Sequence, residues 1–538
     1  MRNLKVAKTS LRRMPDDQHS LVRHGLAGWL AIMAAVLAIN PAGSAWGATA
    51  TSDPVLGLML EKGMITEDDA TRVQAQVDAM RTNDAAQYAQ QDSKWKISPG
   101  IKNLEIFGDL RVRFEDRSAQ DPTGGKIELQ RYRYAARLGL KGELFDDYYY
   151  GLRVETSSNP RSSWVTMGTS SSGVPYQGPF GKSTAGIDIG QIYLGWHPES
   201  WFDITVGKMP NPLYTTSMVW SPSINPEGLA EHFKYTVGEA DLFANFSQFL
   251  YQDVNPVQTT PGFFSSLGNY TGSNPPFLLA WQGGADYHIN KRVDFKLAPV
   301  LYQYIGAPAN TTDTSALPDF GGVYIGQGGP AGYSGYSSGY YDGYFYNQTG
   351  INDLLVLDIP MEINFKLDKF DVRAFGDYAQ NLNGGSRAEA AYLASQSSTI
   401  SLNNNNVPLT PIAAPQTHDD TAYQIGVAIG SKDSLGLVNG TTAKKHSWEV
   451  RSYWQHIEQY SLDPNLIDTD FFNGLENMQG IYCAVAYGLT DNFIGTFRYG
   501  RASRINDKLG TGGSGQDIPQ MNPVNQYDLF QVDLTLKF

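Results

Sequence analysis

Extended segments in which apolar and polar residues alternate recur from residue 103 to the last residue, and this repetition restricts the possible folds more than any other feature. The last segment is LFQVDLTLKF, residues 529–538. It has Phe530, Val532, Leu534, Leu536 and Phe538 on one parity and polar residues on the other. Successive side chains of an extended chain point to opposite faces, so such a segment is expected to form a β-strand with one apolar face. A single segment of this kind fits a soluble sandwich as well as a membrane barrel.

The same criterion predicts about 16 strands along the chain, within a range of 14 to 18. They lie near residues 103–115, 131–144, 148–155, 187–197, 201–209, 229–236, 241–252, 277–288, 293–304, 354–366, 370–380, 421–431, 446–457, 478–489, 493–502 and 525–538. An even number of crossings returns the end of the chain to the side on which the first strand began.

The predicted connections alternate between short turns and long segments. The short turns are FDD, HPES, TVGEA, INKR, LDK and TDN, with a longer member at residues 432–445. The long connections span residues 117–128, 158–186, 210–228, 253–276, 305–353, 381–420, 458–477 and 503–524. A soluble sandwich gives no reason for this alternation, whereas outer-membrane barrels combine short periplasmic turns with long external loops. The sequence therefore predicts an all-β fold, a transmembrane antiparallel β-barrel over residues 100–538.

Aromatic residues gather at the strand ends beside the short turns. They are Tyr148, Trp196, Trp201, Phe202, Tyr287, Phe365, Phe370, Trp448, Tyr487, Phe493 and Phe538. Amphipathic rings are stabilised at the level of the lipid headgroups, so these positions predict an aromatic girdle at the periplasmic rim.

Residues 1–50 are predicted to be a secretory signal peptide. The apolar stretch at residues 26–39 is shorter than the ~20 residues of a spanning helix, follows several Lys and Arg residues, and precedes small residues. Residues 51–99 carry helix-forming patterns, with Gly63 as a stop and Thr66 as an N-cap, and then a polar linker. We therefore expect an exported protein with a short periplasmic helical segment before the barrel.

Charge and composition disfavour several classes of partner and cofactor. The formal net charge of -13 disfavours nucleic acid, which binds clustered basic charge. The single cysteine, Cys483, leaves no thiolate metal cluster, and the histidines show no ligand spacing, so no metal or cofactor is predicted. The stretch GYSSG at residues 335–339 matches the pattern of a hydrolase nucleophile, but it lies in a Gly/Tyr-rich run without the strand and helix that this motif needs. No enzymatic activity is expected.

The signal peptide, the KGMIT stretch at residues 62–66, the alternating strands and the terminal phenylalanine together resemble the Gram-negative outer-membrane porins, specifically the putative porin family. The resemblance covers essentially the whole exported chain. It implies a protein of the outer-membrane lipid bilayer, and a homotrimer. It also implies that Leu534, Leu536 and Phe538 form the signal that the barrel-insertion machinery reads.

The resemblance further implies a constriction loop that folds into the lumen. This loop would follow VGKMPNP and include Pro210, Tyr214, Trp220 and Glu227. Lys208 stands where porins often carry arginine, so the match is incomplete at that position.

If the apolar parity faces lipid, the polar parity of the first three strands lines the lumen. The predicted pore-lining residues are Glu105, Asp109, Arg111, Arg113, Arg131, Arg133, Arg137, Lys141, Arg153 and Glu155. A barrel of this size leaves an aqueous channel, and fixed charges on its wall set its ion preference.

This basic stripe predicts passive diffusion of small hydrophilic solutes and ions with a mild preference for anions. One alternative is a substrate-specific outer-membrane channel for carboxylates or phosphate, which would share the architecture. An outer-membrane barrel enzyme and a soluble extracellular adhesion protein are the remaining, less favoured alternatives.

Overall fold

The computed structural model describes residues 62, 66, 71–73, 100–122, 124–145, 147–157, 162–168, 186–251, 277–305, 354–395, 414–416, 418–440, 444–511 and 523–538 of the chain. The chain divides into two compact units, Met1–Ser98 and Pro99–Phe538. Residues 71–73 are helical. The predicted signal peptide and nearly all of the predicted helical segment at residues 51–99 lie outside the described residues. No helix in the described part of the chain is long and apolar enough to cross a membrane.

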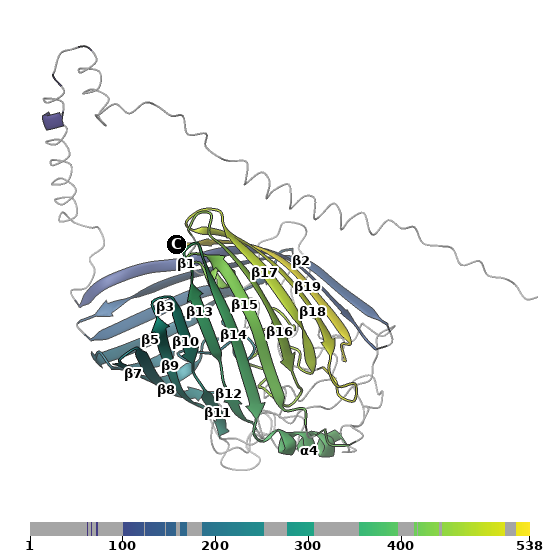
Figure 1. Cartoon of the computed structure of the whole chain (residues 1–538). Coiled ribbons are helices and arrows are strands. Elements are labelled where there is room, and N and C mark those ends of the chain that lie inside the picture. The colour runs from purple at the N-terminus through teal and green to yellow at the C-terminus, as the bar shows by residue number, and fades with distance from the viewer. Residues whose placement is uncertain are drawn as a thin grey trace, which may run out of the picture. The chain divides into compact units, whose positions relative to one another are not determined.

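The second unit is a closed antiparallel barrel of 16 strands (Figure 1). Its strand segments are β1 (Ile101–Gln120), β2 (Lys126–Leu144), β3 (Tyr148–Ser157), β4 (Val165–Thr166), β5 (Gly186–Glu199), β6 (Phe202–Lys208), β7 (Glu227–Val237), β8 (Ala240–Leu250), β9 (Phe277–Asn290), β10 (Val293–Leu297), β11 (Val300–Ile305), β12 (Leu355–Asp358), β13 (Met361–Lys366), β14 (Phe370–Asn381), β15 (Thr421–Ser431), β16 (Trp448–Ile457), β17 (Met478–Gly488), β18 (Phe493–Arg504) and β19 (Gln526–Lys537). The helix α4 (Gly384–Ser395) and the 3-10 turn η3 (Leu437–Asn439) lie in connections.

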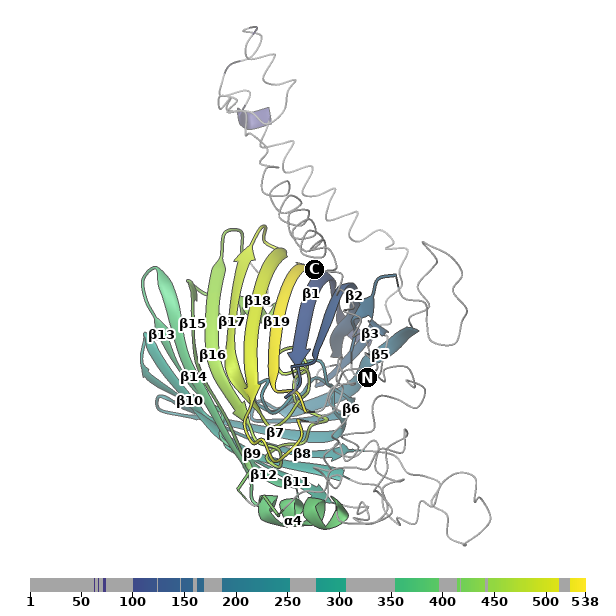
Figure 2. The same cartoon turned by 90° about the vertical axis from the view of Figure 1, so that its right-hand side faces the viewer.

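The barrel closes where β1 pairs with β19, from Asp109 opposite Lys537 to Gln120 opposite Gln526. β4 is a two-residue addition that pairs with β2. Figures 1 and 2 place the C-terminus and α4 at opposite ends of the barrel. Each of the 16 predicted strands corresponds to a crossing in the structure, so the predicted fold class is confirmed.

Two neighbouring crossings are each interrupted by a proline. β10 and β11 are separated at Ala298 and Pro299, and β12 and β13 at Ile359 and Pro360. Proline has no N–H to donate to the ladder, so the pairing must be rearranged there. The Ala298 N–H donates to the Pro360 carbonyl at 3.1 Å, and the Ile359 N–H donates to the Tyr378 carbonyl at 2.8 Å. The wall therefore remains hydrogen-bonded across the break.

The first connection is shorter than the long segment predicted at residues 117–128. β1 continues to Gln120 and β2 begins at Lys126. The prediction was wrong because Asp116 and Ser118 are polar residues at positions that face outward. The apolar pattern of β1 therefore ends earlier than its hydrogen-bonded pairing with β2, which continues to Gln120.

Gly195 on β5 is required by the close approach of an aromatic ring. Tyr149 on β3 crosses above it to donate to Asp203 at 2.7 Å and to meet Thr205 at 2.6 Å. A Cβ added at Gly195 would lie 1.9 Å from the Tyr149 ring. Overpacking of this kind costs about 1–3 kcal/mol. We therefore expect Gly195→Ala to lower the urea midpoint of barrel unfolding, whereas Gly283→Ala, where a Cβ meets nothing within 4 Å, is the matched control and should leave it unchanged.

Candidate pore and constriction

The polar faces of the first two strands are buried and their apolar faces are exposed. Arg113, Glu115 and Arg133 are 2%, 0% and 5% exposed, whereas Leu110 and Leu138 are each 50% exposed. This is the reverse of a soluble protein, and it is the arrangement of a barrel whose outer face meets hydrocarbon.

The residues predicted to line the pore lie along one stretch of the wall. Arg111 and Arg113 line the main cavity described below, and Glu105 and Lys141 line a second, shallower one. The others pair with one another or with their neighbours: Asp109 with Arg111 at 2.6 Å, Arg137 and Arg153 each with Glu155 at 3.2 Å, and Arg131 and Arg133 with Glu115. The wall is therefore a ladder of alternating charges in which arginine predominates.

Glu115 is the centre of this ladder. Its carboxylate is fully buried and pairs with Arg117 at 3.3 Å and Arg133 at 3.4 Å, and also with Arg131. Several guanidinium groups thus share one carboxylate, which leaves positive charge on this part of the wall.

Arg113 connects the wall to a loop in the lumen. Its guanidinium donates to Asp533 on β19 at 2.7 and 2.8 Å and to Asp470 at 2.7 Å. It also lies 4.2 Å from the centre of the Trp164 ring. The planar fork of arginine permits two bidentate carboxylate contacts at once, which a lysine could not make.

The connection between β6 and β7, residues 209–226, folds into the barrel. Met218 and Trp220 in this loop are 0% and 3% exposed. Trp220 lies 6.0 Å from the ring of Phe249 on β8 and 6.3 Å from that of Tyr302 on β11. Loop 209–226 therefore packs on inward-facing side chains of the wall opposite β1 to β3.

The residues predicted for a constriction loop occupy different parts of this loop. Tyr214 and Trp220 line the main cavity. Pro210 is exposed at the start of the loop, and Glu227, the first residue of β7, is exposed directly after it, where it pairs with Lys208 at 2.6 Å.

A second connection also folds inward, between β16 and β17, at residues 458–477. The apolar side chains buried in it are Leu462, Leu466, Ile467, Phe471, Phe472 and Leu475. Its Asp463 accepts hydrogen bonds from the hydroxyls of Tyr251 and Tyr304 at 2.8 and 2.9 Å. The sequence analysis identified this segment only as one of the long connections, and the structure packs its apolar side chains inside the barrel.

The two inward loops contact each other. The Ser221 N–H donates to the Leu466 carbonyl at 2.6 Å, and the Ser221 hydroxyl donates to Asp468 at 3.1 Å. The Asp468 N–H donates to the Ser217 carbonyl at 3.2 Å. Loop 209–226 and loop 458–477 therefore form one connected assembly inside the barrel.

The connection between β15 and β16 adds a third inward element, the turn η3. Glu449 accepts the N–H of Val438 at 2.8 Å, and Arg498 donates to the Val438 carbonyl at 3.0 Å. Arg451 donates to the Asn439 side chain at 3.0 Å. These contacts hold both arginines on the wall beside the cavity.

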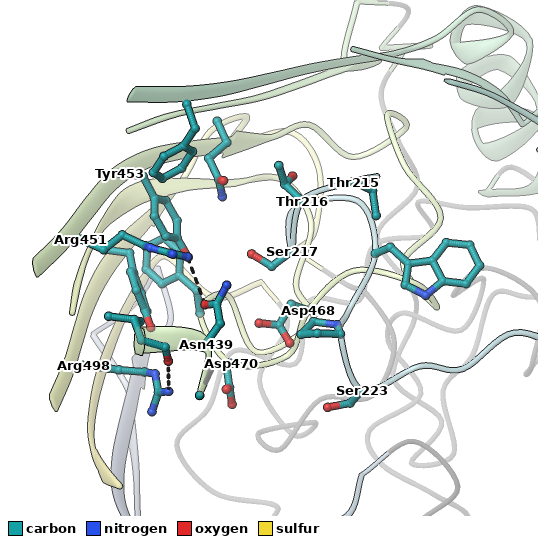
Figure 3. A pocket seen from close by; sticks show the side chains of 18 of the residues that line it. Thr215, Thr216, Ser217, Ser223, Asn439, Arg451, Tyr453, Asp468, Asp470 and Arg498 are labelled. Carbon is teal, nitrogen blue, oxygen red and sulfur yellow. Dashed lines mark hydrogen bonds between the residues drawn. The ribbon is translucent and has the colours of Figure 1, made fainter. Parts of the chain in front are cut away.

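A cavity of about 450 Å³ lies between the two loops and the wall (Figure 3). Its charged lining consists of Arg111, Arg113, Arg373, Arg451, Arg498, Glu362, Asp468, Asp470 and Asp533. Figure 3 shows Arg451 and Arg498 on the wall, across the cavity from Asp468 and Thr216. The space suits a small hydrophilic solute or a hydrated ion.

The sequence matches the family described as "Putative porin" over residues 68–319 and 352–538, which is most of the chain. The chain belongs to the putative porin family. It is an outer-membrane porin channel whose strands cross the membrane repeatedly. No curated protein sequence matches it.

Solved porin structures are similar to this one at low sequence identity. An anion-selective porin from Comamonas acidovorans is 6% identical, with 81% of this chain and 99% of that chain covered and a TM-score of 0.39. The outer membrane channel DcaP of Acinetobacter baumannii is 10% identical, with 82% and 99% covered and a TM-score of 0.38. OmpT of Vibrio cholerae is 9% identical, with 81% and 97% covered and a TM-score of 0.34.

Two carboxyl groups of loop 458–477 have opposite electrostatic surroundings in this porin. Burial and the neighbouring charge of Asp470 raise the pKa of Asp468 to about 7. Burial alone would also raise the pKa of Asp470, but the charge and hydrogen bonds of Arg113 hold it well below its ordinary value. Asp470 is therefore ionised at neutral pH, and Asp468 changes its charge near neutrality.

We expect the ion preference of the porin to depend on pH between about 6 and 8. Below pH 7 Asp468 gains a proton and the cavity loses one negative charge, so the preference for anions should increase as the pH falls. The measurement is the reversal potential across a KCl gradient at pH 6, 7 and 8. Asp468→Asn should show the low-pH value throughout, and an unchanged pH dependence in this variant would assign the effect to another group.

Part of this site was missed by the sequence analysis. Arg451, Arg498 and Asp533 all lie on the polar parity of predicted strands, so alternation alone could have found them. Asp470 lies in a loop, where parity carries no information. Its only signal is the density of large apolar residues between residues 462 and 475, which is unusual for a connection exposed to water.

Proposed function

We propose that this porin allows passive diffusion of small hydrophilic solutes and ions, with a mild preference for anions. The observation that supports the proposal most directly is the arginine content of the constriction. Five arginines line the cavity, against four carboxylates. Arginine keeps its charge at all accessible pH values, so this positive charge is permanent.

The placement of the predicted pore-lining residues supports the same proposal. They extend from Glu105 to Glu155 on β1, β2 and β3, the strands whose apolar parity faces outward. A solute that passes the cavity would therefore meet a predominantly basic wall. Fixed wall charges attract counter-ions over about 8–10 Å at physiological salt.

The test is a reversal potential in planar bilayers with the purified full-length porin. We expect anions to be favoured modestly. Arg451→Gln should reduce this preference, whereas the matched control Arg501→Gln should not, because Arg501 is 59% exposed in its side chain on the outward parity of β18. Strong cation selectivity of the unmodified porin would contradict the proposal.

A substrate-specific channel for carboxylates or phosphate is a second candidate. Two inward loops narrow this lumen, and the guanidinium of Arg451 interacts with Tyr453 and Tyr482, so the cavity offers both a planar group that can bind an anion with two hydrogen bonds and an aromatic surface. Conductance that saturates with phosphate or a carboxylate salt, but rises linearly with KCl, would favour this candidate. Linear conductance for all three salts would favour simple diffusion.

We also propose that the C-terminus serves as the signal for the barrel-insertion machinery and that the porin assembles as a homotrimer. Phe538 pairs with Gly108 through both its N–H and its carbonyl, while its side chain remains 53% exposed. The exposed ring is thus available for recognition. Phe538→Ala should lower the amount of heat-modifiable barrel in outer-membrane fractions several-fold. Phe538→Trp, which keeps an aromatic ring, should retain most of the amount found for the unmodified porin. Equal amounts for the unmodified porin and both variants would contradict the assignment.

The homotrimer is tested by cross-linking membranes before solubilisation, which should give a species of three times the mass of one chain.

A further inference from the structure

Two buried carboxyl groups lie side by side behind loop 209–226. Asp358, the last residue of β12, is 0% exposed, and Asp377 on β14 is 3% exposed. Each acts electrostatically on the other. They lie beside the proline break of the wall, which begins at Ile359. In the described part of the chain, neither carboxylate forms an ion pair with a Lys, Arg or His side chain.

Several buried oxygen atoms around this pair have no hydrogen-bond partner among the described residues. They are both carboxylate oxygens of Asp358, Oδ1 of Asp377, the hydroxyl oxygen of Thr215 and the hydroxyl oxygen of Tyr302. Thr215 and Tyr302 interact with the Asp358 carboxyl group, so all of these atoms belong to one cluster. Each buried polar atom left without a partner costs about 1–3 kcal/mol, and such groups in native proteins require an explanation.

An uncompensated pair of buried charges is not stable in this form. Two adjacent carboxylates without a basic partner must take up a proton or bind a cation. A shared proton would neutralise the pair but supplies only one hydrogen, whereas five oxygen atoms of this cluster lack a hydrogen-bond partner. A cation would satisfy the whole cluster at once.

The donor set indicates which cation fits. All of the available ligands are oxygen atoms, which suits a hard cation and does not suit Zn²⁺ or Cu²⁺, whose preferred ligands are nitrogen and sulfur. Mg²⁺ usually retains several waters, whereas Ca²⁺ accepts 6–8 oxygen ligands, including bidentate carboxylates. A closely packed cluster of carboxylates and hydroxyls therefore favours Ca²⁺.

We propose that Asp358, Asp377, Thr215 and Tyr302 bind a Ca²⁺ ion that fastens the constriction loop to the barrel wall. The site joins loop 209–226, which carries Thr215, to β11, β12 and β14. The loop already contacts the same place, since the Thr216 hydroxyl donates to Asp377 and the Trp220 ring stacks on Tyr302. Figure 3 shows Thr215 and Thr216 on the loop that borders the cavity. The bound ion would thus stabilise one wall of the cavity, and this role does not depend on the ion preference proposed above.

The first experiment measures metal binding and stability together. The purified porin, treated with EDTA and then dialysed, is titrated with CaCl₂ at pH 7.5 while its urea midpoint is followed. We expect Ca²⁺ to raise the midpoint, with half of the effect at about 10⁻⁴–10⁻³ M, and MgCl₂ to have a much smaller effect. Tb³⁺ luminescence excited through Tyr302 and displaced by Ca²⁺ reports the same site directly.

Variants decide between a cation and a shared proton. Asp358→Asn and Thr215→Val should each weaken Ca²⁺ binding by at least about tenfold. Asp358→Asn should be less stable than the unmodified porin in Ca²⁺ but equal or more stable in EDTA, where it removes charge repulsion. The matched control is Asp463→Asn, a buried loop carboxylate whose partners are the Tyr251 and Tyr304 hydroxyls. It should lose stability and keep the full response to Ca²⁺.

The result that would overturn the proposal is a urea midpoint that is the same in EDTA and in 10 mM CaCl₂, with Tb³⁺ luminescence that Ca²⁺ does not displace. A midpoint that then varies with pH in the unmodified porin, but not in Asp358→Asn, would assign the pair to a shared proton. Either result leaves the reversal-potential measurements unaffected.

Discussion

Replacing residues 461–474 with a short Gly/Ser linker is expected to raise the single-channel conductance of this porin at least about twofold, with the barrel still folded. A barrel of 16 strands encloses an aqueous lumen unless loops occupy it. Here loop 458–477 contributes buried side chains such as Phe471 and Phe472 to that lumen. Removing them should widen the path, because β16 and β17 remain paired from Trp448 opposite Tyr487 to Ile457 opposite Met478.

The readout is single-channel conductance in 1 M KCl, with heat-modifiable migration on gels as the test of folding. The control is Phe471→Leu, which keeps an apolar side chain of similar size and should have nearly the conductance of the unmodified porin. A folded deletion variant with unchanged conductance would show that the narrowest point lies elsewhere, for example at loop 209–226 alone.

The barrel itself could be predicted from the sequence because apolar and polar residues alternate within each crossing, according to whether they face lipid or the lumen. Lipid outside and water inside require opposite side chains at successive positions, so Leu110 and Arg111 already identify the two faces. The prediction fails where that requirement ends. Asp116 and Ser118 extend β1 beyond its apolar band, so nothing in the local pattern indicates that the strand continues.

The constriction could be predicted only in part, because contacts between distant segments form it. Loop 209–226 was identified through a resemblance, and Tyr214 and Trp220 do line the cavity. Loop 458–477 has no strand parity, and its position depends on partners far away in the chain, such as Arg113. The carboxyl pair behind the first loop depends in the same way on two strands and a loop that meet only in the folded barrel.

Arg113→Ala is expected to destabilise the porin by about 3–5 kcal/mol and to shift its ion preference towards cations. The guanidinium is 2% exposed and forms ion pairs with Asp533 and Asp470 at the same time. Its removal would leave each carboxylate with one arginine fewer. Asp533 would keep Arg498 and Asp470 would keep Arg117 as a partner. Without the contact between Arg113 and Asp470, loop 458–477 would be held less firmly to this part of the wall. The noise of the open-channel current should therefore also increase.

Three measurements separate these effects: the urea midpoint, the reversal potential and the variance of the open-channel current. Arg113→Lys is the matched control, because it keeps the charge and loses the fork that contacts both carboxylates. It should retain the reversal potential of the unmodified porin and have intermediate stability. If Arg113→Ala had the stability and current noise of the unmodified porin, the loop would have to be held by its other contacts, chiefly those of Asp463 with Tyr251 and Tyr304.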